Sequence, residues 1–184
     1  MLIVNFDPFP ILKTARLTLR QMRDSDKHEF HIIRSNPQLM RYIPRPLSKD
    51  PEDVALLIQS MNEGTAKNDM INWGITITGE DKIIGTIGFF RMKPEHYRAE
   101  IGYLLHGDYH GKGVMQEAVE CALKYGFGEM KLHSVEAVIA PNNIASKKLI
   151  EKCGFVQEAH FKEYEFVNGK YEDILVYSKI TNAK

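Results

Sequence analysis

The chain has 184 residues, of which 43% are hydrophobic and 26% charged, and its 24 Lys and Arg residues balance its 24 Asp and Glu residues. This length is enough to enclose a sizeable hydrophobic core and predicts a single domain over residues 1–184. The composition excludes a disordered, collagen-like or coiled-coil protein, and the zero net charge argues against non-specific nucleic-acid binding, which needs a basic excess.

Cysteine usage and hydropathy bear on the class of protein. The two cysteines, Cys121 and Cys153, are too few for a disulfide framework or for a four-ligand zinc site. The start of the chain has no signal-peptide pattern, and no stretch reaches about 18 apolar residues. We therefore expect a soluble, cytoplasmic protein with no membrane span and no metal.

The predicted elements follow the order β-α-α-β-β-β-α-β-α-β-β. Alternating apolar residues predict a strand over 12–19, cap-type residues at 24–26 precede a helix to about residue 34, and Asp50-Pro51 begins a helix to about residue 62. The later segments are strands over 71–78, 82–90 and 99–105, a helix from 114 to about 127, a strand over 134–140, a helix over 143–152, and strands over 156–167 and 170–180. Asn168-Gly169 predicts a tight hairpin between the last two strands. This order indicates an α+β fold with one strand–helix–strand unit in the centre.

A glycine-rich segment joins a predicted strand to a predicted helix. It consists of His110, Gly111, Lys112, Gly113, Val114 and Met115. Glycine permits backbone conformations closed to other residues, and a helix N-terminus presents unpaired N–H groups and the positive end of the macrodipole, so this turn suits a phosphate. It fits neither the nucleotide-hydrolase loop nor the dinucleotide fingerprint, whose third glycine would replace Gln116. A tight turn with nothing bound remains an equal alternative at this point.

A second segment opens the helix over 143–152. Asn143 and Ser146 lie at its start, and Gly154-Phe155 follows its end. Taken alone, Asn143 is an ordinary N-cap residue and Ser146 an ordinary polar residue of a first helical turn.

Together the two segments resemble the GNAT superfamily of acetyl-CoA-dependent N-acetyltransferases, and more closely its RimJ/RimL-like ribosomal-protein N-terminal acetyltransferase branch. The pyrophosphate loop of that family, Arg/Gln-x-x-Gly-x-Gly/Ala, corresponds to residues 110–115, and its Asn-x-x-Ser followed by Gly-Phe matches Asn143, Ser146 and Gly154-Phe155. Branch features also match at residues 12–20, 100–103 and 168–173, so the resemblance spans about residues 10 to 180. It implies a mixed, mostly antiparallel twisted sheet with helices on both faces.

Two residues depart from the family pattern. His110 replaces the usual Arg or Gln, which changes a side chain and leaves unchanged the backbone amides that hold phosphate. Met115 stands where Gly or Ala is usual, so we expect its side chain to crowd the pyrophosphate.

The resemblance also implies roles for individual residues. The backbone N–H groups of residues 111–115 would hold the pyrophosphate of acetyl-CoA, and Asn143 would bind its pantetheine amides. Glu100 would act as the general base on the attacking amine, with an outward polar residue of an alternating strand as the equal alternative. Ser146 would donate a proton to the departing thiolate. Tyr103 and Tyr109 are weaker candidates for that acid and are expected to pack. Trp73 is expected either in the acceptor cleft or in the core.

The acceptor stays open among three hypotheses. The favoured one is the N-terminal α-amine of a protein, a ribosomal protein by the resemblance; the others are a small amine such as an aminoglycoside or polyamine, and a non-catalytic acetyl-CoA-binding module. An α-amine with a pKa near ~7.7–8.0 costs about 1 kcal/mol to deprotonate at pH 7, whereas a lysine costs about 4–5 kcal/mol. An N-terminal acceptor therefore needs little help from a general base to become neutral. Oligomers are compatible with all three hypotheses.

Overall fold

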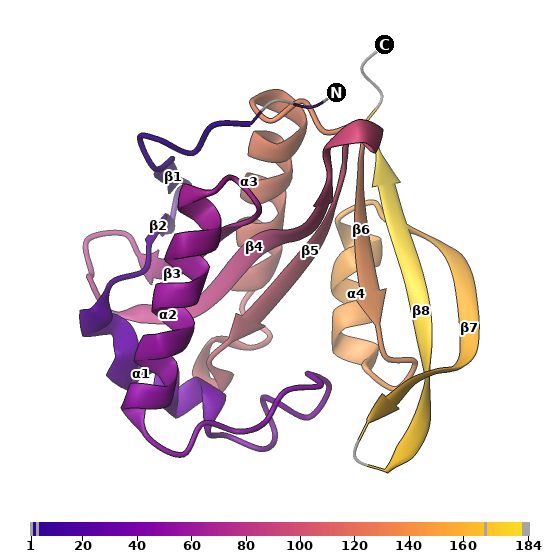
Figure 1. The fold of residues 1–184 in the computed structure, drawn as a ribbon, viewed down its shortest axis with the longest axis horizontal. Coiled ribbons are helices and arrows are strands. Elements are labelled where there is room, and N and C mark those ends of the chain that lie inside the picture. The colour runs from indigo at the N-terminus through magenta and orange to yellow at the C-terminus, as the bar shows by residue number, and fades with distance from the viewer. Residues whose placement is uncertain (1, 3, 168, 182–184) are drawn as a thin grey trace.

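The computed structural model of the chain describes residues 2, 4–167 and 169–181 and forms one eight-stranded sheet covered by helices (Figure 1). The strands are β1 (Leu12–Lys13), β2 (Leu17–Gln21), β3 (Ile71–Ile77), β4 (Ile83–Lys93), β5 (Arg98–Leu105), β6 (Ser134–Ile139), β7 (Val156–Val167) and β8 (Lys170–Ile180). The α-helices are α1 (Lys27–Arg34), α2 (Pro51–Ala66), α3 (Val114–Gly128) and α4 (Ile144–Lys152).

The sheet is mixed and mostly antiparallel, as expected. Its strand order is β1-β2-β3-β4-β5-β6-β8-β7, and β5 and β6 form the parallel pair. Helices α1 and α2 cover one face of the sheet, while α3 and α4 cover the other (Figure 1). The predicted α+β class and its central strand–helix–strand unit, β5-α3-β6, are confirmed.

Three predicted boundaries differ from the structure. The strand expected over 12–19 is split into β1 and β2, because residues 14–16 leave the ladder in a turn in which the Thr14 N–H donates to the Leu17 carbonyl. Helix α2 extends to Ala66, and β4 continues past a bulge to Lys93. The hairpin turn keeps Gly169 at φ 80°, while Asn168 lies outside the described residues.

The sheet opens between its two parallel strands, β5 and β6. The parallel pairing runs from Arg98 and Ser134 to Glu100 and Glu136 and ends there. Beyond these residues β5 continues alongside β4, whereas β6 continues alongside β8, so β5 and β6 diverge (Figure 1). Helix α3 follows the end of β5 and helix α4 follows the end of β6, so both helices begin beside this opening.

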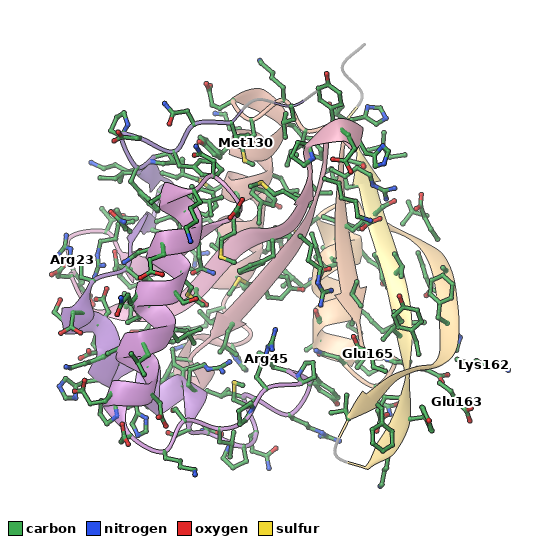
Figure 2. The ribbon with its side chains drawn as sticks, in the orientation of Figure 1. Arg23, Arg45, Met130, Lys162, Glu163 and Glu165 are labelled. Carbon is green, nitrogen blue, oxygen red and sulfur yellow. The ribbon has the colours of Figure 1, made fainter. Side chains whose placement is uncertain are left out.

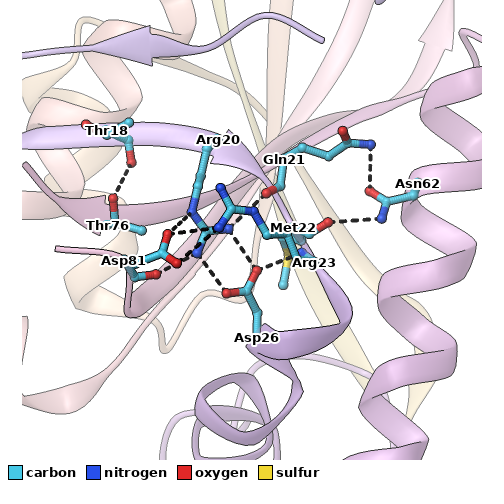
Figure 3. A network of polar contacts seen from close by, with 9 residues as sticks. All are labelled: Thr18, Arg20, Gln21, Met22, Arg23, Asp26, Asn62, Thr76 and Asp81. Atoms are coloured by element: carbon cyan, nitrogen blue, oxygen red, sulfur yellow. Dashed lines mark hydrogen bonds and ion pairs between the residues drawn. The ribbon is translucent and has the colours of Figure 1, made fainter.

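A buried ion pair attaches the α1–α2 layer to the sheet (Figure 3). Arg20 on β2 and Asp26 are 6% and 4% exposed, and the guanidinium donates two hydrogen bonds of 2.8 Å to the carboxylate. Asp26 also accepts the Arg23 N–H, and Arg20 donates to the Asp81 carbonyl at 2.6 Å. These bonds satisfy most of the polar atoms of the pair, as burial of two charges requires.

Trp73 belongs to the core. It is fully buried, its indole N–H donates to the Pro10 carbonyl at 2.8 Å, and its ring meets those of Phe9, Phe89 and Tyr125 edge to face. Of the two positions expected for this residue, the core is therefore correct.

Candidate active site

The turn before α3 owes its shape to two glycines. Gly111 and Gly113 have φ values of 71° and 72°, a left-handed conformation that residues with a side chain rarely adopt. Gly113 is the N-cap of α3, and the first helical bond runs from the Glu117 N–H to the Gly113 carbonyl at 3.1 Å. The N–H groups of residues 114–116 therefore precede the helical ladder and are available at its positive end. Apart from its two chain neighbours, no described residue has an atom within 4 Å of a Cβ placed on Gly111, so the turn is open to a phosphate.

Residues far away in the sequence hold this turn in place. The Glu117 carboxylate accepts hydrogen bonds from the Thr14 hydroxyl at 2.5 Å, the Arg16 N–H at 3.0 Å and the Arg16 Nε at 2.6 Å. Arg16 also donates from Nη1 to the Lys112 carbonyl at 3.0 Å. Burial raises the pKa of Glu117, but these hydrogen bonds outweigh it, so the pKa is lowered. Sequence reasoning missed this function, although the segment 12–20 was part of the family resemblance.

The two departures from the family pattern have structural explanations. The His110 ring binds the Leu105 carbonyl through Nε2 at 3.0 Å, which ties the turn to the end of β5. Met115 is 7% exposed and packs in the main core beside Val114. The expectation that its side chain would crowd a pyrophosphate is therefore wrong, because residue 115 presents only its backbone to the turn.

The start of α4 lies against the face of β5 that α3 and α4 cover. Asn143 caps the helix by accepting the Ser146 N–H at 3.2 Å, and the Ser146 hydroxyl is 2.5 Å from the Tyr103 hydroxyl. The Tyr42 hydroxyl, from the loop between α1 and α2, donates to the Asn142 carbonyl at 2.8 Å. The structure thus brings Asn143 and Ser146 to the opening beside β5.

Two groups near Ser146 remain protonated at neutral pH. Burial raises the pKa of Tyr103 to about 12, although its hydrogen bond with Ser146 acts in the opposite direction. Burial likewise raises the pKa of Cys153 to about 11. Tyr103 can therefore donate a proton or a hydrogen bond, while Cys153 is held as an unreactive thiol.

Glu100 lies on the other face of β5. Residues three apart on a strand point to opposite faces, and Glu100 pairs in the ladder with Phe90, whose ring covers Gly102 on the α1–α2 side. The side chain is 21% exposed, and its Oε2 accepts from Arg91 Nη1 at 2.8 Å. Glu100 and the Tyr103–Ser146 pair therefore lie on opposite faces of one strand, where its pairing with β6 ends.

No described helix is long and apolar enough to cross a membrane. Within the same part of the chain, no group of three or more His, Cys, Asp or Glu side chains is arranged to hold a metal ion.

The sequence from residue 16 to residue 156 matches the family model described as an acetyltransferase (GNAT) domain. The chain belongs to this family. It is 35% identical over 92% of its length to the uncharacterized N-acetyltransferase YoaA of Bacillus subtilis, 96% of which is covered. GNAT enzymes transfer the acetyl group of acetyl-CoA, so this protein is an acetyl-CoA-dependent N-acetyltransferase.

Two solved structures resemble this GNAT enzyme closely. The ribosomal-protein-S5-alanine acetyltransferase of Vibrio fischeri superposes with a TM-score of 0.82 at 27% identity, covering 94% of this chain and 97% of that one. The spermidine N-acetyltransferase of Vibrio cholerae, in complex with CoA and spermine, superposes with a TM-score of 0.79 at 25% identity, covering 91% and 96%. The relatives thus include enzymes for protein and for polyamine acceptors.

Proposed function

We propose that this enzyme acetylates the N-terminal α-amine of a protein, a ribosomal protein being the first candidate, and that Glu100 and Ser146 act from opposite faces of β5. One observation carries this proposal. The carboxylate of Glu100 and the Tyr103–Ser146 hydroxyl pair flank the place where β5 and β6 diverge. An amine can approach from the α1–α2 side while the thioester lies on the α3–α4 side.

In this proposal the α3–α4 side holds acetyl-CoA. The N–H groups of residues 111–115, together with the turn formed by Gly111 and Gly113, bind the pyrophosphate. His110 and Lys112 flank the turn, and the capping residue Asn143 has an amide group near the path of the pantetheine arm. Acetyl-CoA supplies the thioester from which the acetyl group is transferred.

Acetyl transfer forms a nitrogen–carbon bond and breaks a carbon–sulfur bond. One proton must leave the attacking nitrogen, and one must reach the departing sulfur. Glu100 accepts the first, directly or through a water, and Arg91 orients its carboxylate through the 2.8 Å ion pair. Ser146 donates the second, and the protonated Tyr103 hydroxyl at 2.5 Å keeps that serine supplied with a proton.

The α-amine is preferred to a lysine because of the free energy needed to make each neutral. This cost is about 1 kcal/mol for an α-amine and about 4–5 kcal/mol for a lysine at pH 7. The acceptor with the smaller of these costs needs less help from a carboxylate that is already paired with Arg91.

The proposal is tested by letting three acceptors compete for the purified enzyme and acetyl-CoA. They are a peptide with a free N-terminus and no lysine, an N-terminally blocked peptide with one lysine, and spermidine. We expect the free N-terminus to be acetylated fastest, measured by mass spectrometry alongside thiol release. Faster acetylation of spermidine or of the blocked peptide would overturn the N-terminal assignment, and no thiol release with any acceptor would overturn the catalytic one.

A further inference from the structure

A cationic pocket adjoins the acceptor side of the proposed active site. It has a volume of about 780 Å³ and lies between helix α2, strand β4 and the loop that joins α1 to α2. Its lining includes Arg34, Arg45 and Lys49, together with one carboxylate, Asp53, which already accepts the Lys49 N–H at 2.8 Å. Figure 2 shows Arg45 on that loop and Glu165 on strand β7.

The two arginines of this pocket have no carboxylate partner among the described residues. The Nε atom of Arg34 is buried without a hydrogen bond, as is that of Arg20, and the Nη1 atom of Arg34 donates to the Met40 sulfur at 3.5 Å. Burial lowers the pKa of Arg34, and the positive charge of Arg45 lowers it further. Two neighbouring guanidinium charges, one with an N–H donor that has no acceptor, are unfavourable unless an anion binds between them.

Arg20 is an example in the same chain of an arginine with a structural role. Its guanidinium binds Asp26 through two 2.8 Å bonds and lies 3.3 Å from Asp81, and these carboxylates raise its pKa (Figure 3). Arg34 has the opposite environment and the opposite pKa shift. A structural role alone therefore does not explain the pair Arg34 and Arg45.

The pocket lies next to the residue proposed as the base. Phe90 contributes to the pocket lining and pairs directly with Glu100 in the antiparallel ladder, so both side chains project from the same face. Neighbouring strands are about 4.8 Å apart, and an extended peptide advances about 3.3 Å per residue. A peptide whose α-amine reaches Glu100 and which then runs past Phe90 would place its second or third residue at the Phe90 end of this pocket.

We propose that Arg34 and Arg45 bind the carboxylate of an acidic side chain in the second or third residue of the acceptor peptide. The inference rests on the proposed N-terminal acetylation and specifies its substrate class. A guanidinium presents a planar fork that matches a carboxylate, and two of them repel the cationic chain of a polyamine. Lys49 adds to the attraction from the rim.

The test compares three hexapeptides with the same free N-terminus and no lysine. Their second and third residues are both Glu, both Gln or both Arg, and kcat/KM is measured for each with acetyl-CoA saturating. We expect the Glu peptide to exceed the Gln peptide by about tenfold, the effect of a charge-assisted hydrogen bond, and the Arg peptide to be poorest. Arg45→Gln should abolish the preference, and Arg45→Glu should reverse it in favour of the Arg peptide.

Arg41→Gln is the matched control, because it removes the same charge from the same loop at an exposed residue that stacks on Tyr42 outside the pocket lining. It should leave the preference intact. Equal kcat/KM for the three peptides, or a preference unaffected by Arg45→Glu in a folded variant, would overturn the pocket proposal while leaving N-terminal acetylation standing. Absence of acetylation of every peptide, with spermidine still acetylated, would instead overturn the proposed function beneath it.

Discussion

The two faces of β5 carry different kinds of chemical groups. On the α3–α4 side, the groups that matter are backbone N–H groups at a fixed helix end and two hydroxyls joined at 2.5 Å. On the α1–α2 side they are long charged side chains, among them Arg45, Arg91 and Glu100, carried by a loop, a bulge and a strand. A face that binds one unchanging cofactor can rely on backbone geometry, whereas a face that selects an acceptor can change its side chains without altering the fold.

The largest effect is expected from removing Ser146, the proposed proton donor on the α3–α4 side. We expect Ser146→Ala to lower kcat by about 10²-fold with little change in the KM for acetyl-CoA, because a proton donor to sulfur acts in the transition state. Steady-state kinetics with a saturating peptide measures both constants. Tyr103→Phe is the companion variant, and it should lower kcat less because Ser146 keeps its own hydroxyl. Unchanged turnover in Ser146→Ala would remove this residue from the mechanism.

A second variant tests whether backbone shape holds the cofactor. Gly113→Val places a β-branched residue at φ 72°, at a strain of about 1–3 kcal/mol, and it disturbs the N–H groups at the helix start. CoA affinity measured by calorimetry should fall at least about tenfold. Gly79→Val is the matched control, since Gly79 also has a positive φ of 89° but lies in the β3–β4 turn, away from the site. If both variants fold and bind CoA equally well, the assignment of the turn is wrong.

The pH profile distinguishes the contributions of the two faces. For an α-amine acceptor, kcat/KM should rise roughly eightfold from pH 7 to a plateau above pH ~8, as the amine becomes neutral. Tyr103 must be protonated to act, and because its pKa is raised to about 12, its proton is retained across this whole range. No falling limb is therefore expected below about pH 10, judged with a peptide that lacks lysine. A decline between pH 8 and 9 would contradict the role given to Tyr103.

The smallest expected effect concerns the support of the cofactor turn. The pKa of Glu117 is lowered in the folded state, so its bonds stabilise the protein above the unfolded-state pKa and lose that contribution as the pH falls through the folded one. Glu117→Gln should cost about 1 kcal/mol of unfolding free energy at pH 7, since Arg16 is half exposed and screened by water. Urea titrations should show the deficit shrinking in acid. Glu120→Gln, a change on the outer side of the same helix, should cost less.

Sequence reasoning recovered most of the fold and the tight turn at Gly111 and Gly113 because their signals are local. Alternation gives strands, Asp50-Pro51 begins a helix, and Gly111 and Gly113 mark a turn that few other residues can form. The support of that turn was not predictable in this way, because Thr14 and Glu117 lie 103 residues apart and meet only in the folded chain.

The acceptor side was less predictable for a related reason. Nothing in the local sequence distinguishes Arg20, which has two carboxylate neighbours, from Arg34, which has none among the described residues. The difference depends on which residues tertiary packing brings alongside. Likewise, the crowding expected from Met115 followed from its position in a motif, whereas the helix turns this side chain into the core.

The most direct test of the central claim is mass spectrometry of protein N-termini from cells that contain or lack this protein. The account predicts that a small set of N-termini loses acetylation when the protein is absent, and that acidic residues are enriched at the second and third positions of that set. Re-expression of the wild-type chain should restore acetylation, and re-expression of Glu100→Gln should not. Unchanged N-termini together with the loss of an acetylated polyamine would contradict it.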